Sequence, residues 1–179
     1  MPSFDAIADL PLEVESCEFE GLEVTLGEFE RLTTIVKLRG AGEEGIGEDV
    51  VYDAIDHVAQ QGHGPPEGLA FSGSFAEFSE HLGGIDLFPA GPPVREEISP
   101  AYRRWAFESA ALDLALRQAG TSLAAALDRE PRPLNFVNSM RLAGFDGNER
   151  SSIEPLLARL AVYQPCASSW TPPTTGMMD

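Results

Sequence analysis

Few residue types that carry catalytic chemistry occur at a usable spacing in this chain. The three histidines, His57, His63 and His81, have no metal-ligand spacing, and we expect them on the surface or in capping positions. The two cysteines, Cys17 and Cys166, also lack the spacing of a metal site and give no support for a disulfide. The sequence shows no nucleophile triad, no phosphate-binding glycine loop and no metal cluster. We therefore predict no catalytic residue and no metal ligand.

Two acids in one predicted helix, Glu108 and Asp113, are the nearest approach to an acid and base pair. They lie five positions apart, which is about 140° around a helix, so they cannot serve one site. The one glycine signature, Gly45-x-Gly47-Glu48, is typical of a hairpin turn when judged on spacing alone. Acidic runs near the N-terminus are expected to form a solvated face.

The helix predicted over Ser99–Gly120 is the element that must organise the others. Ser99 is suited to cap it, Pro100 suits its first position, and Gly120 is placed to end it. Polar pairs, Arg104 with Glu108 and Asp113 with Arg117, separate two apolar sides. One side contains Trp105, Leu112, Leu116 and Ala119, and the other contains Ala106, Phe107, Ala110 and Leu114.

A helix with two apolar faces needs a neighbour on each, because an ordinary surface helix shows only one stripe. Burying each large side chain would contribute about 1.5–3 kcal/mol. Two interpretations remain open at this point. The helix is either the centre of one α-rich core, or it is wedged between its own small domain and a second body.

Composition limits the partners. The 29 acidic and 12 basic residues give a net charge of -17, which argues against nucleic acid and anionic membranes. Lys37 is the single lysine. The first residues lack the basic and apolar segments of a signal peptide, and no later stretch reaches the length of a membrane span. We expect a cytoplasmic protein.

The first half of the chain predicts a three-stranded antiparallel meander followed by helices. A helix over 53–61 should place Ile55, Val58 and Ala59 inward, residues 63–73 should form a loop, and Ser74 should cap a helix over 75–82 that ends at Gly83. The strands are expected at 10–26, with a break at Gly21, at 31–39 and at 46–52, joined by a loop over 27–30 and a turn over 40–45.

The character of the sequence changes after Arg129–Pro133. Leu134–Leu142 is typical of a strand and Ser151–Tyr163 of an amphipathic helix, which together would open a βα series. Residues 164–179 show no periodicity. We expect this tail to be frameshifted, because codons read out of frame can encode a lysine-bearing strand.

The order of these parts resembles the mandelate racemase and muconate lactonizing branch of the enolase superfamily. The resemblance implies an α+β capping domain over 1–132, the first strand and helix of an incomplete β/α barrel of the TIM type over 133–163, and an irregular tail over 164–179. The matching residues are Gly45-x-Gly47-Glu48, Arg104-x-Ala106-x-Glu108-Ser109-Ala110-x-x-Asp113-Leu114, Ala119-Gly120-Thr121-Ser122-Leu123, Leu127 and Arg132-Pro133-Leu134.

Enzymes of this family remove the α-proton of a small carboxylate substrate, using Mg²⁺ and lysine or histidine bases held by the barrel. The resemblance implies that two cap loops close over the substrate, one near residues 27–30 and one near 49–53. The substrate-binding residues expected on this basis are Gly27, Glu28, Phe29, Glu30 and Ser139.

This sequence departs from the family pattern in ways that predict a loss of activity. A barrel takes about 250 residues, and far fewer follow Pro133. The metal-ligand positions are missing, and Lys37 lies in a cap strand. We therefore expect a truncated chain without cofactor or activity, which oligomerises or aggregates through the exposed face that a barrel would cover. The alternative is a stand-alone acidic interaction module whose second apolar face binds a partner protein.

Overall fold

The computed structural model describes residues 3–26, 29–89, 96–130 and 132–133. The chain divides into two units, Met1–Pro131 and Arg132–Asp179, and all of the described strands and helices belong to the first. The strand predicted from Leu134 to Leu142, the helix predicted from Ser151 to Tyr163 and the tail lie outside the described residues.

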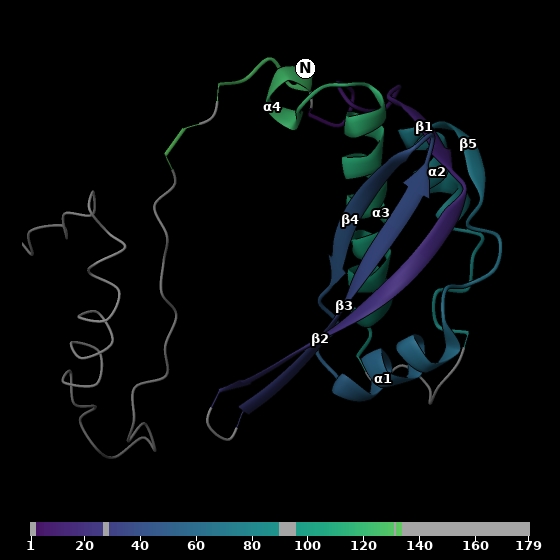
Figure 1. Cartoon of the computed structure of the whole chain (residues 1–179), viewed down its shortest axis with the longest axis vertical. Coiled ribbons are helices and arrows are strands. Elements are labelled where there is room, and N and C mark those ends of the chain that lie inside the picture. Colours follow the sequence, from purple (N-terminus) through teal and green to yellow (C-terminus); the bar gives the residue numbers. More distant parts are fainter. Residues whose placement is uncertain (1–2, 27–28, 90–95, 131, 134–179) are drawn as a thin grey trace, which may run out of the picture. The chain divides into compact units, whose positions relative to one another are not determined.

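The first unit is an α+β structure (Figure 1). In the described residues its elements are, in chain order, β1 (Pro11–Val14), β2 (Ser16–Leu26), β3 (Phe29–Gly40), β4 (Glu43–Asp49), α1 (Ala54–His63), β5 (Phe71–Ser74), α2 (Phe75–Leu82), α3 (Ser99–Gln118) and α4 (Leu123–Ala126).

Strands β2, β3 and β4 form a three-stranded antiparallel sheet, which confirms the predicted meander. Ala41 and Gly42 both have positive φ, at 50° and 80°, and make the two-residue turn between β3 and β4. Two details of the prediction are wrong. The turn is shorter than residues 40–45, and the last strand ends at Asp49 instead of Tyr52.

The predicted break in the first strand is misplaced. Gly21 lies within β2 and pairs with Thr34, whereas the chain breaks at Glu15, whose N–H donates to the carbonyl of Arg39 (2.8 Å). The segment before Glu15 forms β1, which pairs with β5 in a separate two-stranded sheet. Residues 71–73, predicted as loop, therefore belong to a strand, because β1 supplies hydrogen-bond partners from a distant part of the chain.

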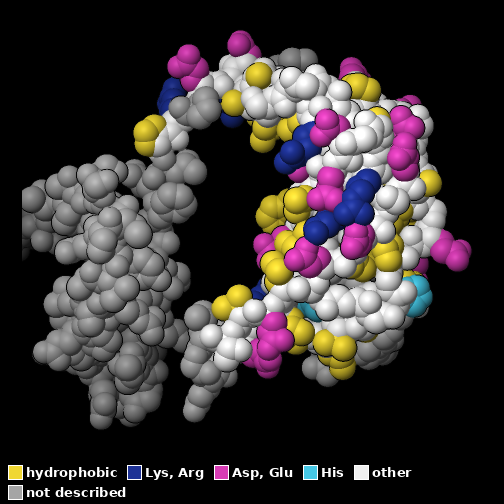
Figure 2. All heavy atoms as spheres, in the orientation of Figure 1, with side chains coloured by type: hydrophobic (Ala, Val, Ile, Leu, Met, Phe, Trp, Pro, Cys, Tyr) yellow, Lys and Arg dark blue, Asp and Glu magenta, His cyan; other side chains and the backbone are white. Residues whose placement is uncertain are grey.

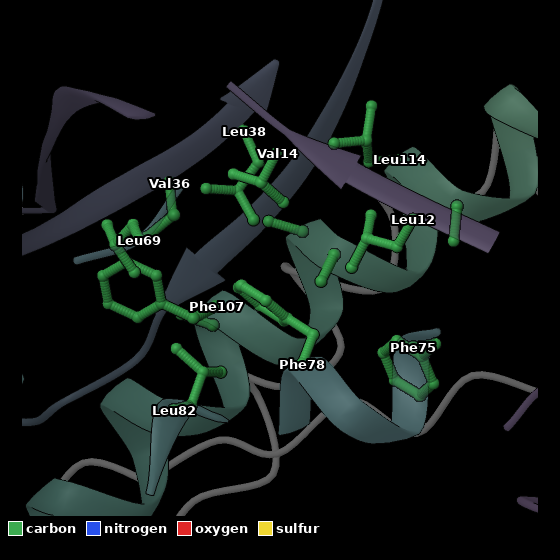
Figure 3. Packing of buried hydrophobic residues seen from close by; sticks show 14 of the residues in the cluster. Leu12, Val14, Val36, Leu38, Leu69, Phe75, Phe78, Leu82, Phe107 and Leu114 are labelled. Carbon is green, nitrogen blue, oxygen red and sulfur yellow. The ribbon is translucent and has the colours of Figure 1, made fainter. Parts of the chain in front are cut away.

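Helix α3 packs on one face of the sheet (Figure 1). Gly45 and Gly47 allow this close approach, since a Cβ at either position would lie 2.2 Å from the carbonyl oxygen of Ala110 or 2.1 Å from that of Ala106. Figure 3 shows the resulting core between β3, α3, β1 and α2. Its labelled side chains are Leu12, Val14, Val36, Leu38, Leu69, Phe75, Phe78, Leu82, Phe107 and Leu114.

The ends of the helices follow most of the predicted signals. Ser74 and Glu77 form a capping box at α2, and Gly83 follows its last turn. Ser99 does not cap α3 as predicted. It is the first helical residue and is buried, while Ile98 occupies the cap position and makes no side-chain cap hydrogen bond.

The orientation predicted for α1 is wrong. Ile55 is 43% exposed and Val58 is 58% exposed, while Ala59 is only half-buried. Instead, α1 turns its polar side inward, and the buried residues are Asp56, His57 and Gln60. The reason is that the interior beneath α1 is itself polar, as the next section describes.

The face of the sheet opposite α3 carries paired charges. Lys37 pairs with Glu20, and Arg39 contacts Glu18 (2.7 Å) and Glu44 (2.6 Å). Figure 2 shows basic and acidic side chains side by side over this part of the molecule. The acidic run of β2 is thus solvated, as predicted, but it has basic partners on β3. None of the described helices is long and apolar enough to cross a membrane.

Candidate functional site at one end of the sheet

The two segments expected to close over a substrate lie at the same end of the sheet. Pairing of β3 with β4 stops at Thr34 and Asp49, whereas pairing of β2 with β3 continues to Leu26 and Phe29. The β2–β3 hairpin therefore projects beyond the point where β4 ends and the chain turns toward α1 (Figure 1). The topology of the meander brings the tip of the hairpin and residues 50–53 to one end.

The predicted binding residues fall into two groups. Gly27, Glu28 and Ser139 lie outside the described residues. Phe29 and Glu30, expected in a loop, belong to β3. Glu30 is exposed at this projecting end.

Glu30 shares its surroundings with a second carboxyl group, that of Glu23 on β2. A hydrogen bond with Glu23, followed by repulsion from its negative charge, raises the pKa of Glu30 above its ordinary value. Two carboxyl groups this close resist ionising together. The pair can therefore hold one proton at the end of the sheet at a pH where an isolated glutamate would be ionised.

Arg31 connects the hairpin to the segment after β4. Its Nη1 donates to the carbonyl of Tyr52 (3.2 Å) and its Nη2 to the carbonyl of Val50 (3.1 Å). The guanidinium also lies over the ring of Tyr52, with 5.5 Å between Cζ and the ring centroid. Arg31 thus fixes the β2–β3 hairpin relative to residues 50–52, which belong to the second segment expected to close over a substrate. The side chain of Tyr52 itself is exposed.

A buried ion pair lies beneath this end. Arg103 of α3 donates from Nε to Oδ2 of Asp49 (2.8 Å), and both side chains are almost fully enclosed. Arg103 also donates to the carbonyls of Leu87 (3.1 Å) and Asp56 (3.0 Å), and its Cζ lies 3.6 Å from the ring centroid of Phe88. Asp49 is therefore held inside the domain and does not face a substrate.

His57 completes the polar interior, contrary to the expectation of a surface or capping role. Its Nε2 lies 2.8 Å from the carbonyl oxygen of Val51, which can only accept, so Nε2 carries a hydrogen. Its Nδ1 lies 3.0 Å from Oγ1 of Thr34, which in turn accepts from Nε2 of Gln61 (2.9 Å). The neutral Nε2–H form satisfies every member of this chain, with the hydroxyl donating to Nδ1.

Asp56 and Gln60, one turn apart on α1, retain unpaired groups. Oδ2 of Asp56 and both amide atoms of Gln60 are buried and have no hydrogen-bond partner within the described residues. Buried polar atoms of this kind are normally satisfied, often by internal water. They mark the inner face of α1 as a place where the protein alone does not complete the hydrogen bonding.

A second surface is formed by the outer side of α3. The Phe107 side of α3 is buried against the sheet, as predicted, while Trp105 is 60% exposed. Arg104 pairs with Glu108 and Arg117 with Asp113, as the spacing predicted. Further along α3, a wide, open groove is lined by Ser109, Leu112, Asp113, Leu116, Arg117, Thr121, Ser122 and Leu123.

The groups available at the end of the sheet are the guanidinium of Arg31, the carboxyl groups of Glu23 and Glu30 and the exposed ring of Tyr52. In the described part of the chain, no group of three histidine, cysteine or carboxylate side chains is arranged to hold a metal ion. These residues therefore do not fit the Mg²⁺ that the family resemblance implies. The roles of Arg31, Arg103 and His57 were not predicted from the sequence. Only Arg31, at the start of a β-branched run, gave any signal of its role.

One family model matches the chain. It is described as the N-terminal domain of a domain of unknown function, DUF8230, and it matches residues 5–126. No curated protein and no solved structure matches. The matched region contains all of the described strands and helices, including the end of the sheet with Arg31 and Arg103. The chain therefore belongs to the DUF8230 family, through its N-terminal domain.

Proposed function

We propose that this domain is the capping domain of an enolase-type enzyme, which closes over a small carboxylate substrate while a second domain removes the α-proton. The observation that carries the proposal is the placement of two closing segments at one end of the sheet, tied together by Arg31. Racemase, cycloisomerase and dehydratase reactions all share the enediolate that this proton removal forms, and they fall within the proposal.

The residues of this chain have positioning roles in that reaction. The hairpin and residues 50–53 would exclude water above the substrate, and Arg103 and His57 would hold the base of the second segment rigid from below. We propose that the ligands of Mg²⁺ and the catalytic bases lie in the second domain, because the described residues do not fit the metal. This chain alone is then inactive.

The exposed side of α3 supports the same proposal. Trp105 and the groove beside Leu112 offer an apolar surface on the side of α3 opposite the sheet. The family description names this domain as N-terminal, which suits a domain that packs on a second one. Cys17 forms no disulfide within the described residues, and we propose a cytoplasmic location.

A stand-alone interaction module is the second candidate. It is favoured by the core of the first unit, which joins β1, β3, α2 and α3. In this case the α3 surface binds a partner protein and no catalysis is involved.

Hydrophobic-dye binding and sedimentation of the full chain separate the two candidates. As a cap without its second domain, the chain should bind anilinonaphthalene sulfonate and self-associate, and Trp105→Glu should abolish most of both. Ile46→Glu is the matched control, because Ile46 is 45% exposed on β4 and should leave the signal unchanged. A dye-free monomer that unfolds cooperatively would favour the module.

Deuterium exchange at the α-carbon of small carboxylates, measured by NMR in the presence of added Mg²⁺, tests whether the chain is inactive. The chain alone should show none. Exchange that persists with a chelator would overturn both candidates, since it would require catalytic groups within this chain.

A further inference from the structure

The two edges of the β2–β3–β4 sheet differ in how their backbone groups are satisfied. The two-residue turn makes Gly40 and Glu43 a hydrogen-bonded pair. Because hydrogen-bonded and non-hydrogen-bonded pairs alternate along antiparallel strands, this pair determines which backbone N–H and C=O groups of the edge strands point away from the sheet. At the β4 edge the outward N–H of Ile46 donates to Oδ2 of Asp113 on α3 (3.0 Å). Helix α3 thus covers this edge at Ile46.

The β2 edge is open. By the same alternation, its outward backbone groups belong to Cys17, Phe19, Gly21, Glu23 and Thr25. No hydrogen bond to these outward groups is formed within the described residues. With 11 residues, β2 offers an edge about 35 Å long that contains no proline and no bulge.

The side chains along this edge indicate what could pair with it. On the face opposite α3, β2 carries the carboxylates of Glu18 and Glu20, both more than half exposed although each contacts one basic residue of β3. Leu22 and Val24 follow on the same face and are 40% and 51% exposed. An added strand would therefore meet negative charge first and apolar surface next.

A second copy of this chain is a poor occupant. It would bring β2 against β2, and the carboxylates of Glu18, Glu20 and Glu23 would be concentrated along one seam. The net charge of -17 adds further repulsion between copies. Charge complementarity instead favours a different chain that supplies lysine or arginine.

We propose that the open edge of β2 is a docking site for an extended basic segment of a partner protein, which adds to the sheet as a fourth strand. Its backbone pairs with the outward groups from Cys17 to Thr25, and its alternate basic side chains contact Glu18 and Glu20. The remaining alternate residues are small or apolar and lie toward Phe19, since the amide of Gln61 already covers Gly21. This site is separate from the α3 surface and does not depend on the proposed capping function.

The test is a titration of the full chain, labelled with ¹⁵N, by a synthetic peptide of about ten residues that alternates lysine with valine and threonine. We expect shift changes and slowed hydrogen exchange at the amides of Cys17, Phe19, Gly21, Glu23 and Thr25. The amide of Ile46 serves as the internal control, because it already donates to Asp113. Raising the salt concentration should weaken binding.

Matched variants separate the backbone pairing from the charge. Glu23→Pro removes one outward N–H at an edge position and should weaken binding about tenfold, whereas Glu23→Gln removes only the charge and should weaken it about threefold or less. A peptide N-methylated at alternate amides provides the same comparison if Glu23→Pro fails to fold.

Several results would overturn the proposal. They are no binding, equal binding of a peptide with glutamate in place of lysine, equal binding of the N-methylated peptide, or shifts centred on α3. A dimer of the chain alone that protects the same five amides would make a second copy the occupant and would equally overturn it.

Discussion

Arg103 and Asp49 form an ion pair inside the domain, with 2.8 Å between Nε and Oδ2, at the point where β4 ends and the path toward α1 begins. Both side chains are enclosed, so neither charge has access to water. The remaining donors of Arg103 reach the carbonyls of Leu87 and Asp56. Arg103 thereby connects α3 to the end of β4 at Asp49, to α1 at Asp56 and to Leu87 in the segment after α2.

Removing Arg103 should therefore be severely destabilising. Arg103→Met leaves the Asp49 carboxylate buried without a partner, and we expect a loss of about 3–5 kcal/mol in the free energy of unfolding, measured by urea denaturation. Arg117→Met is the control, because Arg117 is 51% exposed and its i,i+4 pair with Asp113 should be worth less than about 1 kcal/mol. Similar losses in the two variants would contradict the structural role assigned to Arg103.

Close packing of β4 on α3 gives a second prediction. A Cβ at Gly45 would lie 2.2 Å from the backbone oxygen of Ala110, which cannot move without displacing α3. Gly45→Ala should therefore destabilise the domain by about 1–3 kcal/mol, as overpacking does elsewhere. Gly62→Ala in α1 meets nothing within 4 Å and should instead stabilise by about 0.5–1 kcal/mol. Thermal unfolding of both variants checks the pair.

The parts of the fold that depend on local signals could be predicted from the sequence. The three-stranded meander, the Ser74 cap and the ion pairs along α3 follow from alternation, capping chemistry and i,i+4 spacing. The two apolar sides of α3 were also evident, and the structure buries the Phe107 side while leaving Trp105 exposed.

The features that were predicted wrongly depend on contacts with segments distant in the sequence. Periodicity placed Ile55 and Val58 inward, but α1 packs over Thr34 and Arg103, which need polar partners, so His57 takes the inner side. The pairing of β1 with β5 was likewise invisible, since nothing near Phe71 indicates a strand until Val14 lies beside it. At the candidate site, the common end of the two closing segments followed from the meander, but Arg31 did not.

The hydrogen-bond chain through His57 predicts a single tautomer. Nε2 faces the carbonyl of Val51 and Nδ1 faces the hydroxyl of Thr34, so the neutral ring should carry its proton on Nε2. Thr34→Val removes the donor to Nδ1 and the acceptor for Gln61, and we expect a loss of about 1–3 kcal/mol. Ring ¹⁵N shifts report the tautomer, with exposed His63 as the reference. A ring protonated on Nδ1 alone would contradict the arrangement.

The carboxyl pair at the projecting hairpin predicts a pH dependence. Because Glu23 raises the pKa of Glu30, the folded state binds more protons than the unfolded state, so the pair favours folding at low pH and this contribution is lost as the pH rises past 4.5 through the raised pKa. Glu23→Gln should bring the pKa of Glu30 back toward its ordinary value, as followed by the ¹³C shift of its carboxyl group.

Glu77 provides the internal control for that titration, with the opposite sign. The backbone N–H and the hydroxyl of Ser74 donate to its carboxylate and lower its pKa, so its contribution to stability is present above pH 4.5 and is lost as the pH falls. Glu23→Gln should leave Glu77 unchanged, because it acts only within the hairpin. If the pKa of Glu30 does not fall in this variant, the two carboxyl groups do not share a proton, and the proton-holding role assigned to this end of the sheet is wrong.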